Sequence, residues 1–507
     1  MRVSQRIQAK YDELIRRSRE ISLLSSCSEL LSWDEETYMP PGGVEQRGRQ
    51  LALLAGLRHE MLSNPAVGEL LETLESSPLV EDPDTPAAAN IREIRKSHDR
   101  RRKIPRLLLE EIVRVSTSAQ REWSTAYKTS DFARFRPWLE KLVSLKRSEA
   151  EALDREGELY DALLEDYEPG ARATKLEQTF GALRDKLVPL VNRISNARRQ
   201  PDDTILTREY PLDAQRAFTR RVAEQLGFDF NAGRIDETVH PFCARIGPGD
   251  SRIATRYSTS HFAQGLFAVV HEVGHAFYEQ GLDPELFGTP AGNTTSIGMH
   301  ESQSRLWENI VGRSLSFWNF FFEKARDAFP SALSGVRLDA FHFAINRVGP
   351  TCVRAEADEV TYNLHVLVRF ELERALVNGN LEPADLPDAW NSRYKTYLGI
   401  TPGSDRDGCL QDGHWGSGLF GYFPTYTLGN MFAAQLHARA LKDCGDFSER
   451  FSRGEFGDLL EWLRQNVHRR GRIFQAERLL EVVTGSPPSH KPFIDMLWNK
   501  YESLYGL

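Results

Sequence analysis

Apolar side chains recur at helical spacing along most of the chain. Residues 3–24 place five of them, from Ile7 to Ile21, along one side of a helix, with charged residues between. The run Met39 to Gly43 contains two prolines and two glycines, which end a second helical segment. Further helical segments are predicted over 44–61, 66–76, 87–128 (one helix or a pair), 132–164 and 171–198, and helices resume from about residue 260.

Strand signals are confined to the region between about residues 203 and 257. Three runs there are short and bounded by turn residues: Thr204–Thr207, Gly233–Asp236 and Ser251–Tyr257. The pattern predicts a mostly α protein with a small β-sheet.

Domain boundaries are weakly marked. We predict an N-terminal helical lobe over 1–200 and a second region over 201–507 that holds the sheet. No linker rich in proline, glycine or serine separates them, so one continuous structural unit is expected. The long charged helices of the lobe could form a lid or a dimer face.

Composition excludes several classes of protein. The chain has 507 residues, of which 40% are hydrophobic, so it can bury a large core and is not disordered. Its net charge of −8 argues against nucleic-acid binding. Five scattered cysteines and the lack of an apolar stretch in the first 27 residues predict reduced thiols and a cytoplasmic protein. The uncharged run Gly413–Ala438 holds many glycines and two histidines, which favours a cavity wall over a membrane span.

The strongest chemical signal is His-Glu-Val-Gly-His at positions 271–275, inside a helical pattern that Gly281 could end. Residues four apart share one helix face, so His271 and His275 can reach one Zn²⁺ while Glu272 lies beside it as a general base. The alternative is a pair of histidines that only satisfy local contacts.

A zinc site of this kind needs a third protein ligand. Residues 281–298 are rich in glycine and proline and turn the chain, and a new helical segment follows. Glu301 in that segment lies 301 − 275 = 26 residues beyond His275, and two antiparallel helices would bring it to the metal. Glu308 and His300 are rivals on the same helix.

Several further motifs occur in a fixed order along the chain. They are Trp33 to Gly43, Asp250 to Ala254, His300-Glu-Ser-Gln-Ser304, Val353-Arg-Ala-Glu-Ala-Asp358 and Gly408 to Trp415. With the 271–275 motif, they make the sequence similar to the carboxypeptidase Taq family, the M32 metallocarboxypeptidases. Ala254 departs from the threonine of that pattern, although Thr255 follows it.

The resemblance carries expectations about fold, activity and cofactor. It implies a helical cytosolic homodimer with a deep groove that removes C-terminal residues from peptides with broad specificity. It also implies that Glu301 is the third metal ligand. The metal is expected to be Zn²⁺, with Co²⁺ as a possible substitute, and the partners are peptides with a free C-terminus, not nucleic acid or membranes.

Arg354 is the candidate for recognising the substrate's terminal carboxylate, because a guanidinium binds a carboxylate through two parallel hydrogen bonds. A helix through this region would align Arg354, Asp358, Tyr362 and His365 in one polar stripe, which suggests a cavity. The alternative is a structural ion pair between Arg354 and Asp358, and both hold if Asp358 orients the arginine.

The transition state needs a hydrogen-bond donor for its developing negative oxygen. Tyr426, with His414 nearby, is favoured on resemblance to related zinc peptidases, and Tyr422 is expected to line the same site. The alternative is an aromatic wall used only for packing. His240, in His-Pro-Phe at 240–242, either lines the groove or is an ordinary turn residue.

These assignments predict hydrolysis by a water that the metal activates, with Glu272 as the general base. A zinc endopeptidase or dipeptidase with the same metal site is one alternative. A helical scaffold with an inactive site is the other.

Overall fold

The computed structural model describes residues 2–153 and 156–507. Helices make up 69% of the chain and one three-stranded sheet lies among them, which confirms the predicted fold class. The first half contains α1 (Arg2–Thr37), α2 (Val44–Leu62), α3 (Pro65–Leu74), α4 (Pro86–Lys103), α5 (Arg106–Thr129), α6 (Phe132–Leu153), α7 (Leu159–Leu164), α8 (Ala173–Ser195) and α9 (Leu212–Leu226).

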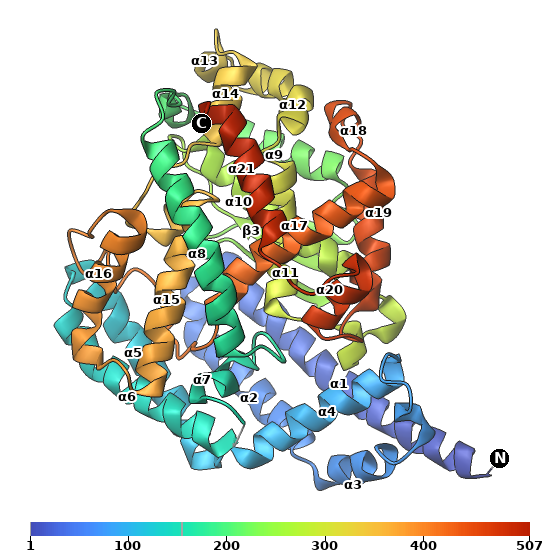
Figure 1. The fold of residues 1–507 in the computed structure, drawn as a ribbon. Helices are drawn as coiled ribbons and strands as arrows, with labels where there is room; N and C mark the ends of the chain where they lie inside the picture. The colour runs from blue at the N-terminus through green and yellow to red at the C-terminus, as the bar shows by residue number, and fades with distance from the viewer. Residues whose placement is uncertain (1, 154–155) are drawn as a thin grey trace.

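The second half begins with the sheet strands β1 (Gly233–Glu237), β2 (Phe242–Gly247) and β3 (Asp250–Thr255). The helices that follow are α10 (Phe262–Gly281), α11 (Ile297–Arg305), α12 (Leu315–Ala328), α13 (Pro330–Leu333), α14 (Leu338–Ile345), α15 (Thr361–Asn378), α16 (Leu386–Leu398), α17 (Pro424–Cys444), α18 (Ser448–Ser452), α19 (Gly457–Asn466), α20 (Ala476–Thr484) and α21 (Lys491–Tyr505). In Figure 1, the first helices run along the lower part of the molecule, and the last ones, in red and orange, lie in its upper centre and along its right side.

Two long segments predicted as helical are divided. The segment 87–128 is a pair of helices, because Pro105 lacks the N–H that would continue α4 into α5. The segment 132–164 contains α6 and α7, and residues 154 and 155 between them lie outside the described residues.

The sheet has strand order β1-β3-β2, with β1 parallel and β2 antiparallel to β3. The predicted strands near 233–236 and 251–257 are confirmed, whereas β2 was not predicted. The strand predicted at Thr204–Thr207 is wrong, since these residues form a 3₁₀ turn. The Asp202 carboxylate accepts hydrogen bonds from the backbone N–H and the hydroxyl of Thr204, which stabilises the turn.

The apolar core is nearly continuous. One cluster of buried side chains extends from Val115 to Tyr505, and a small second cluster beneath α1, α3 and α4 includes Leu14 and Leu71. The division into lobes at residue 200 stays a prediction. Over the described residues, no helix has the length and apolar character needed to cross a bilayer.

Helix α11 lies between α10 and α17 at the centre of the molecule (Figure 1). Two glycines permit this close approach. A Cβ on Gly274 of α10 would lie 2.6 Å from the backbone oxygen of Gln303, and a Cβ on Gly429 of α17 would lie 2.5 Å from Cγ of Glu301. Any larger residue at either position would push α11 away.

Candidate metal centre and carboxylate site

Helix α10 places His271 and His275 one turn apart, with ring centroids separated by 4.9 Å. The Oε2 atom of Glu301 on α11 lies 3.5 Å from Nε2 of His271 and 3.4 Å from Nε2 of His275. One ligand atom from each residue lies within 4.8 Å of the other two. The structure therefore brings together the three residues considered as metal ligands.

The far side of each imidazole is held by the protein. Nδ1 of His271 lies 2.9 Å from Oε2 of Glu308, and Nδ1 of His275 lies 3.1 Å from the backbone oxygen of His300. Such partners fix the proton on Nδ1 and leave Nε2 as the donor atom for a metal. The two-histidine, one-carboxylate set fits a divalent transition metal with an open position.

Glu301 is oriented from its own helix. Its Oε1 accepts a hydrogen bond from Nε of Arg305 at 2.7 Å, and its Oε2 accepts one from the Ser304 hydroxyl at 2.9 Å. Sequence reasoning assigned no role to Arg305, although a basic residue four positions after an acid on a helix is a readable signal.

The two rivals for the third ligand position have other contacts. Glu308 lies in a π-helical turn (Leu306–Val311), where it binds the outer nitrogen of His271. His300 stacks on His275 at 4.3 Å between ring centroids, and its Nε2 lies 3.0 Å from Oε1 of Glu279.

Glu272 lies between the two histidines in sequence and is buried. Burial raises the pKa of this carboxyl to about 7, with the charge of Glu301 adding to the increase. A carboxyl with such a pKa can accept and return a proton near neutral pH.

Arg354 is held by groups other than those the sequence suggested. It lies in a 3₁₀ turn (Arg354–Glu356) and not on a helix, because α15 begins only at Thr361. The predicted stripe beginning at Arg354 is therefore wrong. The Asp358 carboxylate accepts hydrogen bonds from the backbone N–H groups of Val360 and Thr361, which caps α15.

The predicted ion pair between Arg354 and Asp358 is likewise wrong, because Asp412 takes that place. Its Oδ1 accepts hydrogen bonds from Nε and Nη2 of Arg354 at 3.1 and 2.7 Å, and its Oδ2 accepts one from Nε of Arg369 at 2.5 Å. The Arg369 side chain is fully buried. The cluster of two guanidiniums and one carboxylate carries a net charge of +1, which suits an anionic ligand.

Sequence reasoning missed Asp412 and Arg369. The signal for Asp412 was its place in the segment Gly408 to Trp415. Arg369 offered none, because its partner is 43 residues away.

The aromatic residues considered for the oxyanion gather beside this cluster. The Tyr426 hydroxyl lies 3.1 Å from Nε2 of His414, and the guanidinium of Arg354 lies 4.9 Å from the Tyr426 ring centroid. Tyr422 packs against Tyr426, with ring centroids 5.4 Å apart. Burial lowers the pKa of His414 to about 4 and raises that of Tyr426, so both side chains are neutral at pH 7.

Tyr362 connects the metal cluster with the carboxylate cluster. Nη1 of Arg354 donates a hydrogen bond to the Tyr362 hydroxyl at 2.8 Å, and the guanidinium of Arg305 lies 4.3 Å from the centroid of the same ring. Since Arg305 also binds Glu301, a short chain of contacts joins the two sites.

Two sequence-derived candidates lie apart from these contacts. His240 is exposed in the connection between β1 and β2, and among the described residues it has no hydrogen bond or ring contact to the site. Ala254 is buried, and the Thr255 hydroxyl points to the other face of β3, where it is buried without a partner among the described residues. Thr255 thus does not supply a hydroxyl at the position of Ala254.

Comparisons with known proteins agree with this arrangement. The family model for carboxypeptidase Taq (M32) metallopeptidases matches residues 13–501. Thermostable carboxypeptidase 1 of Thermus thermophilus is 48% identical, over 98% of this chain and 99% of that protein. Carboxypeptidase 1 of Bacillus subtilis is 37% identical, over 96% of this chain and 97% of that protein.

Solved structures give the same result. The crystal structure of the M32 carboxypeptidase from Deinococcus radiodurans R1 matches with a TM-score of 0.95 and 39% identity, covering 98% of this chain and all of that chain. With the fold, the three-residue metal cluster and these matches in agreement, the chain belongs to the carboxypeptidase Taq (M32) family of metallopeptidases, hydrolases that act on peptide bonds.

Proposed function

We propose that this protein is a zinc-dependent carboxypeptidase that removes C-terminal residues from peptides with broad specificity. The observation that carries the proposal is the connection of two clusters through Tyr362. The first cluster has the donor atoms for one metal ion, and the second is a buried cationic group suited to a free carboxylate.

His271, His275 and Glu301 would hold the ion. When bound, Zn²⁺ supplies Lewis acidity, which polarises the scissile carbonyl and lowers the pKa of water to about 7. Co²⁺ has similar ligand preferences and could substitute. Glu308 and the backbone oxygen of His300 keep both imidazoles in the orientation that ligation needs.

The remaining chemistry belongs to side chains of this chain. Glu272 takes the proton of the attacking water and delivers it to the leaving amine. Arg354, held by Asp412, anchors the terminal carboxylate, so the last peptide bond is the one that reaches Glu272. The Tyr426 hydroxyl donates a hydrogen bond to the developing oxyanion, and neutral His414 positions that hydroxyl. Tyr422 completes the aromatic wall.

The general-base role is tested by Glu272→Gln, which keeps the shape of the side chain. The variant should retain its metal content and lose most of its activity, since a general base contributes about 10²- to 10⁴-fold. Elemental analysis and turnover of a mixed peptide, with and without chelator, measure both properties. Substantial turnover by a metal-loaded variant would refute the role.

The end of the peptide that shortens tests the rest of the proposal. Loss of residues from the C-terminus, abolished by amidation, is expected of a carboxypeptidase. Internal cleavage of a blocked peptide would contradict it. The resemblance to the family also supports a cytoplasmic homodimer. Sedimentation of the purified protein can check the oligomeric state.

A further inference from the structure

A buried carboxylate that the proposed reaction does not use lies on α15. The Glu373 side chain is fully buried, and both of its oxygens accept hydrogen bonds. Oε1 accepts from the Tyr160 hydroxyl and from the backbone N–H of Gly421, both at 2.6 Å, and Oε2 accepts from Nε1 of Trp415 at 2.6 Å. Hydrogen bonds to an ionised acceptor are roughly twice as strong as those between neutral groups. Glu373 thus joins three separate segments of the chain.

Two of these donors belong to the segment that carries the proposed oxyanion residues. Residues 399–423 connect α16 to α17 through turns and bends. An ordered connection of this length is usually a functional loop. Trp415 directly follows His414, and Gly421 directly precedes Tyr422. The carboxylate therefore holds the loop at the two points next to these side chains.

Helix α15 binds the same loop at a third point. Arg369 lies one turn before Glu373, and its Nε donates a hydrogen bond to Oδ2 of Asp412. Residues four apart share one face of a helix. One face of α15 therefore holds the loop both before and after His414.

The loop also packs directly against α7, the helix that carries Tyr160. A Cβ on Gly421 would lie 2.7 Å from the backbone carbonyl group of Leu163. Gly421 has a φ of +91°, which residues with a side chain rarely adopt. Both features require glycine at this position, where its N–H donates to Glu373.

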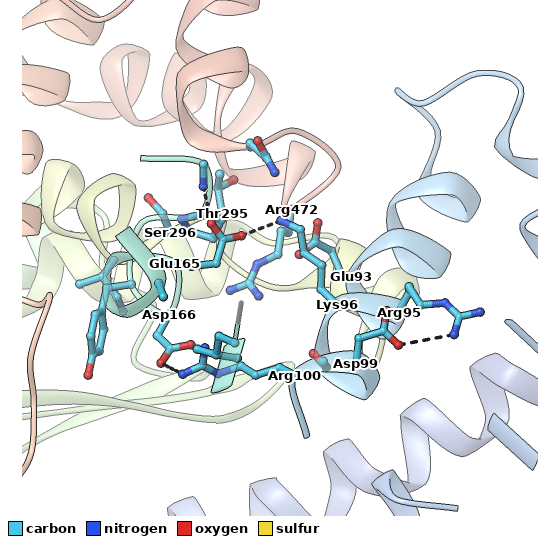
Figure 2. A pocket seen from close by; sticks show the side chains of 18 of the residues that line it. Glu93, Arg95, Lys96, Asp99, Arg100, Glu165, Asp166, Thr295, Ser296 and Arg472 are labelled. Carbon is cyan, nitrogen blue, oxygen red and sulfur yellow. Dashed lines mark hydrogen bonds and ion pairs between the residues drawn. The ribbon is translucent and has the colours of Figure 1, made fainter. Parts of the chain in front are cut away.

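Helix α7 is in turn attached to α4 by ion pairs. The residues that follow α7 line a cavity of about 730 Å³ (Figure 2). There, Glu165 pairs with Lys96 at 3.0 Å and Asp166 pairs with Arg100 at 2.5 Å. The loop is thus bound to a part of the fold that is itself anchored.

We propose that Glu373 is a positioning residue for the peptidase reaction, which holds His414 where its Nε2 binds the Tyr426 hydroxyl. This role rests on the proposed function, in which that hydroxyl donates to the oxyanion. Because Trp415 follows His414 directly, the bond from its indole to Glu373 limits how far His414 can shift. The 3.1 Å contact between His414 and Tyr426 depends on that limit.

The test compares variants of the metal-loaded protein in peptide hydrolysis at pH 8.5. This pH keeps Glu373 ionised, because burial raises its pKa to about 7. In Glu373→Gln, the amide oxygen still accepts from Tyr160 and Gly421, but the NH₂ group faces the indole N–H of Trp415, which is also a donor. Trp415→Phe removes that N–H alone.

Both variants should lower kcat while the binding of substrate is kept. Loss of a whole oxyanion donor costs about 10²- to 10³-fold, so displacement of that donor should lower kcat about tenfold. KM should stay within about twofold of wild type, because Arg354 is held separately by Asp412.

Tyr160→Phe is the matched control. It also removes one hydrogen bond from the buried carboxylate, but on the α7 side and not from the loop that carries His414. Its melting temperature should fall like that of Glu373→Gln, while its kcat stays within about twofold of wild type.

Crystal structures of the variants give a readout that does not require turnover. In Glu373→Gln, the distance between Nε2 of His414 and the Tyr426 hydroxyl should increase from 3.1 Å to beyond about 3.5 Å, outside hydrogen-bond range. In Tyr160→Phe the same distance should be kept.

Three results would overturn the role of Glu373. They are an unchanged distance in Glu373→Gln, an unchanged kcat in both loop variants, and a loss of kcat in Tyr160→Phe as large as theirs. A wild type that does not shorten peptides from the C-terminus would instead contradict the proposed function, and the crystal distances would still decide whether Glu373 positions His414.

Discussion

Asp412 pairs with two guanidiniums at a site that is largely buried. Arg354, Asp412 and Arg369 have side-chain exposures of 12%, 11% and 0%. The two cations hold the pKa of Asp412 well below its usual range, against the opposing effect of burial. In Asp412→Asn, two buried cations lose the carboxylate that pairs with both of them, which costs about 3–5 kcal/mol of stability.

The expected shift in melting temperature follows from chain length. At ~2.1 cal/mol/K of unfolding entropy per residue, a chain of this size has about 1 kcal/mol/K, so Tm should fall by about 3–5 °C. The folded pKa of Asp412 lies below its unfolded pKa. Its stabilisation is therefore complete at neutral pH and is lost as pH falls below about 4, so the difference between wild type and variant should shrink in acid.

The Asp412→Asn change should also lower peptidase activity, because it weakens substrate binding by Arg354. Arg354 loses two charge-assisted hydrogen bonds that orient it, so kcat/KM on peptides with a free carboxylate should fall about 10- to 100-fold, mainly through KM. Amidated peptides should be much less affected. The matched control is Asp213→Asn, which breaks an exposed pair with Arg216 and should cost about 0–1 kcal/mol.

Calorimetry and steady-state kinetics measure these quantities. Equal losses on free and amidated peptides would show that Asp412 does not act through Arg354. A stability change as small as that of Asp213→Asn would refute the electrostatic reasoning itself.

Three further predictions concern the surroundings of α11 and the carboxylate site. Gly429→Ala should displace Glu301, lower metal content and cost about 1–3 kcal/mol, whereas Gly181→Ala, which meets nothing within 4 Å, should be neutral or slightly stabilising; metal analysis and calorimetry check both. Burial raises the pKa of Glu168 to about 8, so the native state binds its proton more tightly than the unfolded chain and wild-type stability should fall between about pH 5 and pH 8. Urea unfolding of Glu168→Gln should lack that decrease, and an identical pH profile would contradict it. Arg354→Ala should lose more activity on free-carboxylate peptides than on amidated ones, measured as kcat/KM; equal losses would leave the arginine a structural role.

Features set by local spacing could be predicted from the sequence. Four-residue spacing on a helix is enough to place His271 and His275 on one face, and the structure has them there. The helical class and two of the strands also follow from local periodicity.

Features that depend on competing local contacts were predicted wrongly. Asp358 suits either a helix face or a helix cap, and its bonds to the N–H groups of Val360 and Thr361 decide for the cap. The same competition turns Thr204–Thr207 into a 3₁₀ turn.

Partners distant in sequence could not be predicted. Asp412 meets Arg354 across 58 residues and Arg369 across 43, and no periodicity relates them. Glu308 contacts His271 from within a π turn, and a π turn cannot be predicted from helical periodicity.

The tight packing of α11 has a consequence for how the protein acquires its ion. Glu301 is fixed by Arg305, by Ser304 and by the close approach at Gly274 and Gly429, all of which are protein contacts. The position of Glu301 in the metal site is thus set by protein contacts that form on folding. The apo protein should keep its circular dichroism spectrum after dialysis, and should take up different ions afterwards without refolding. Which ion the enzyme carries in the cell would then depend on supply as much as on the polypeptide.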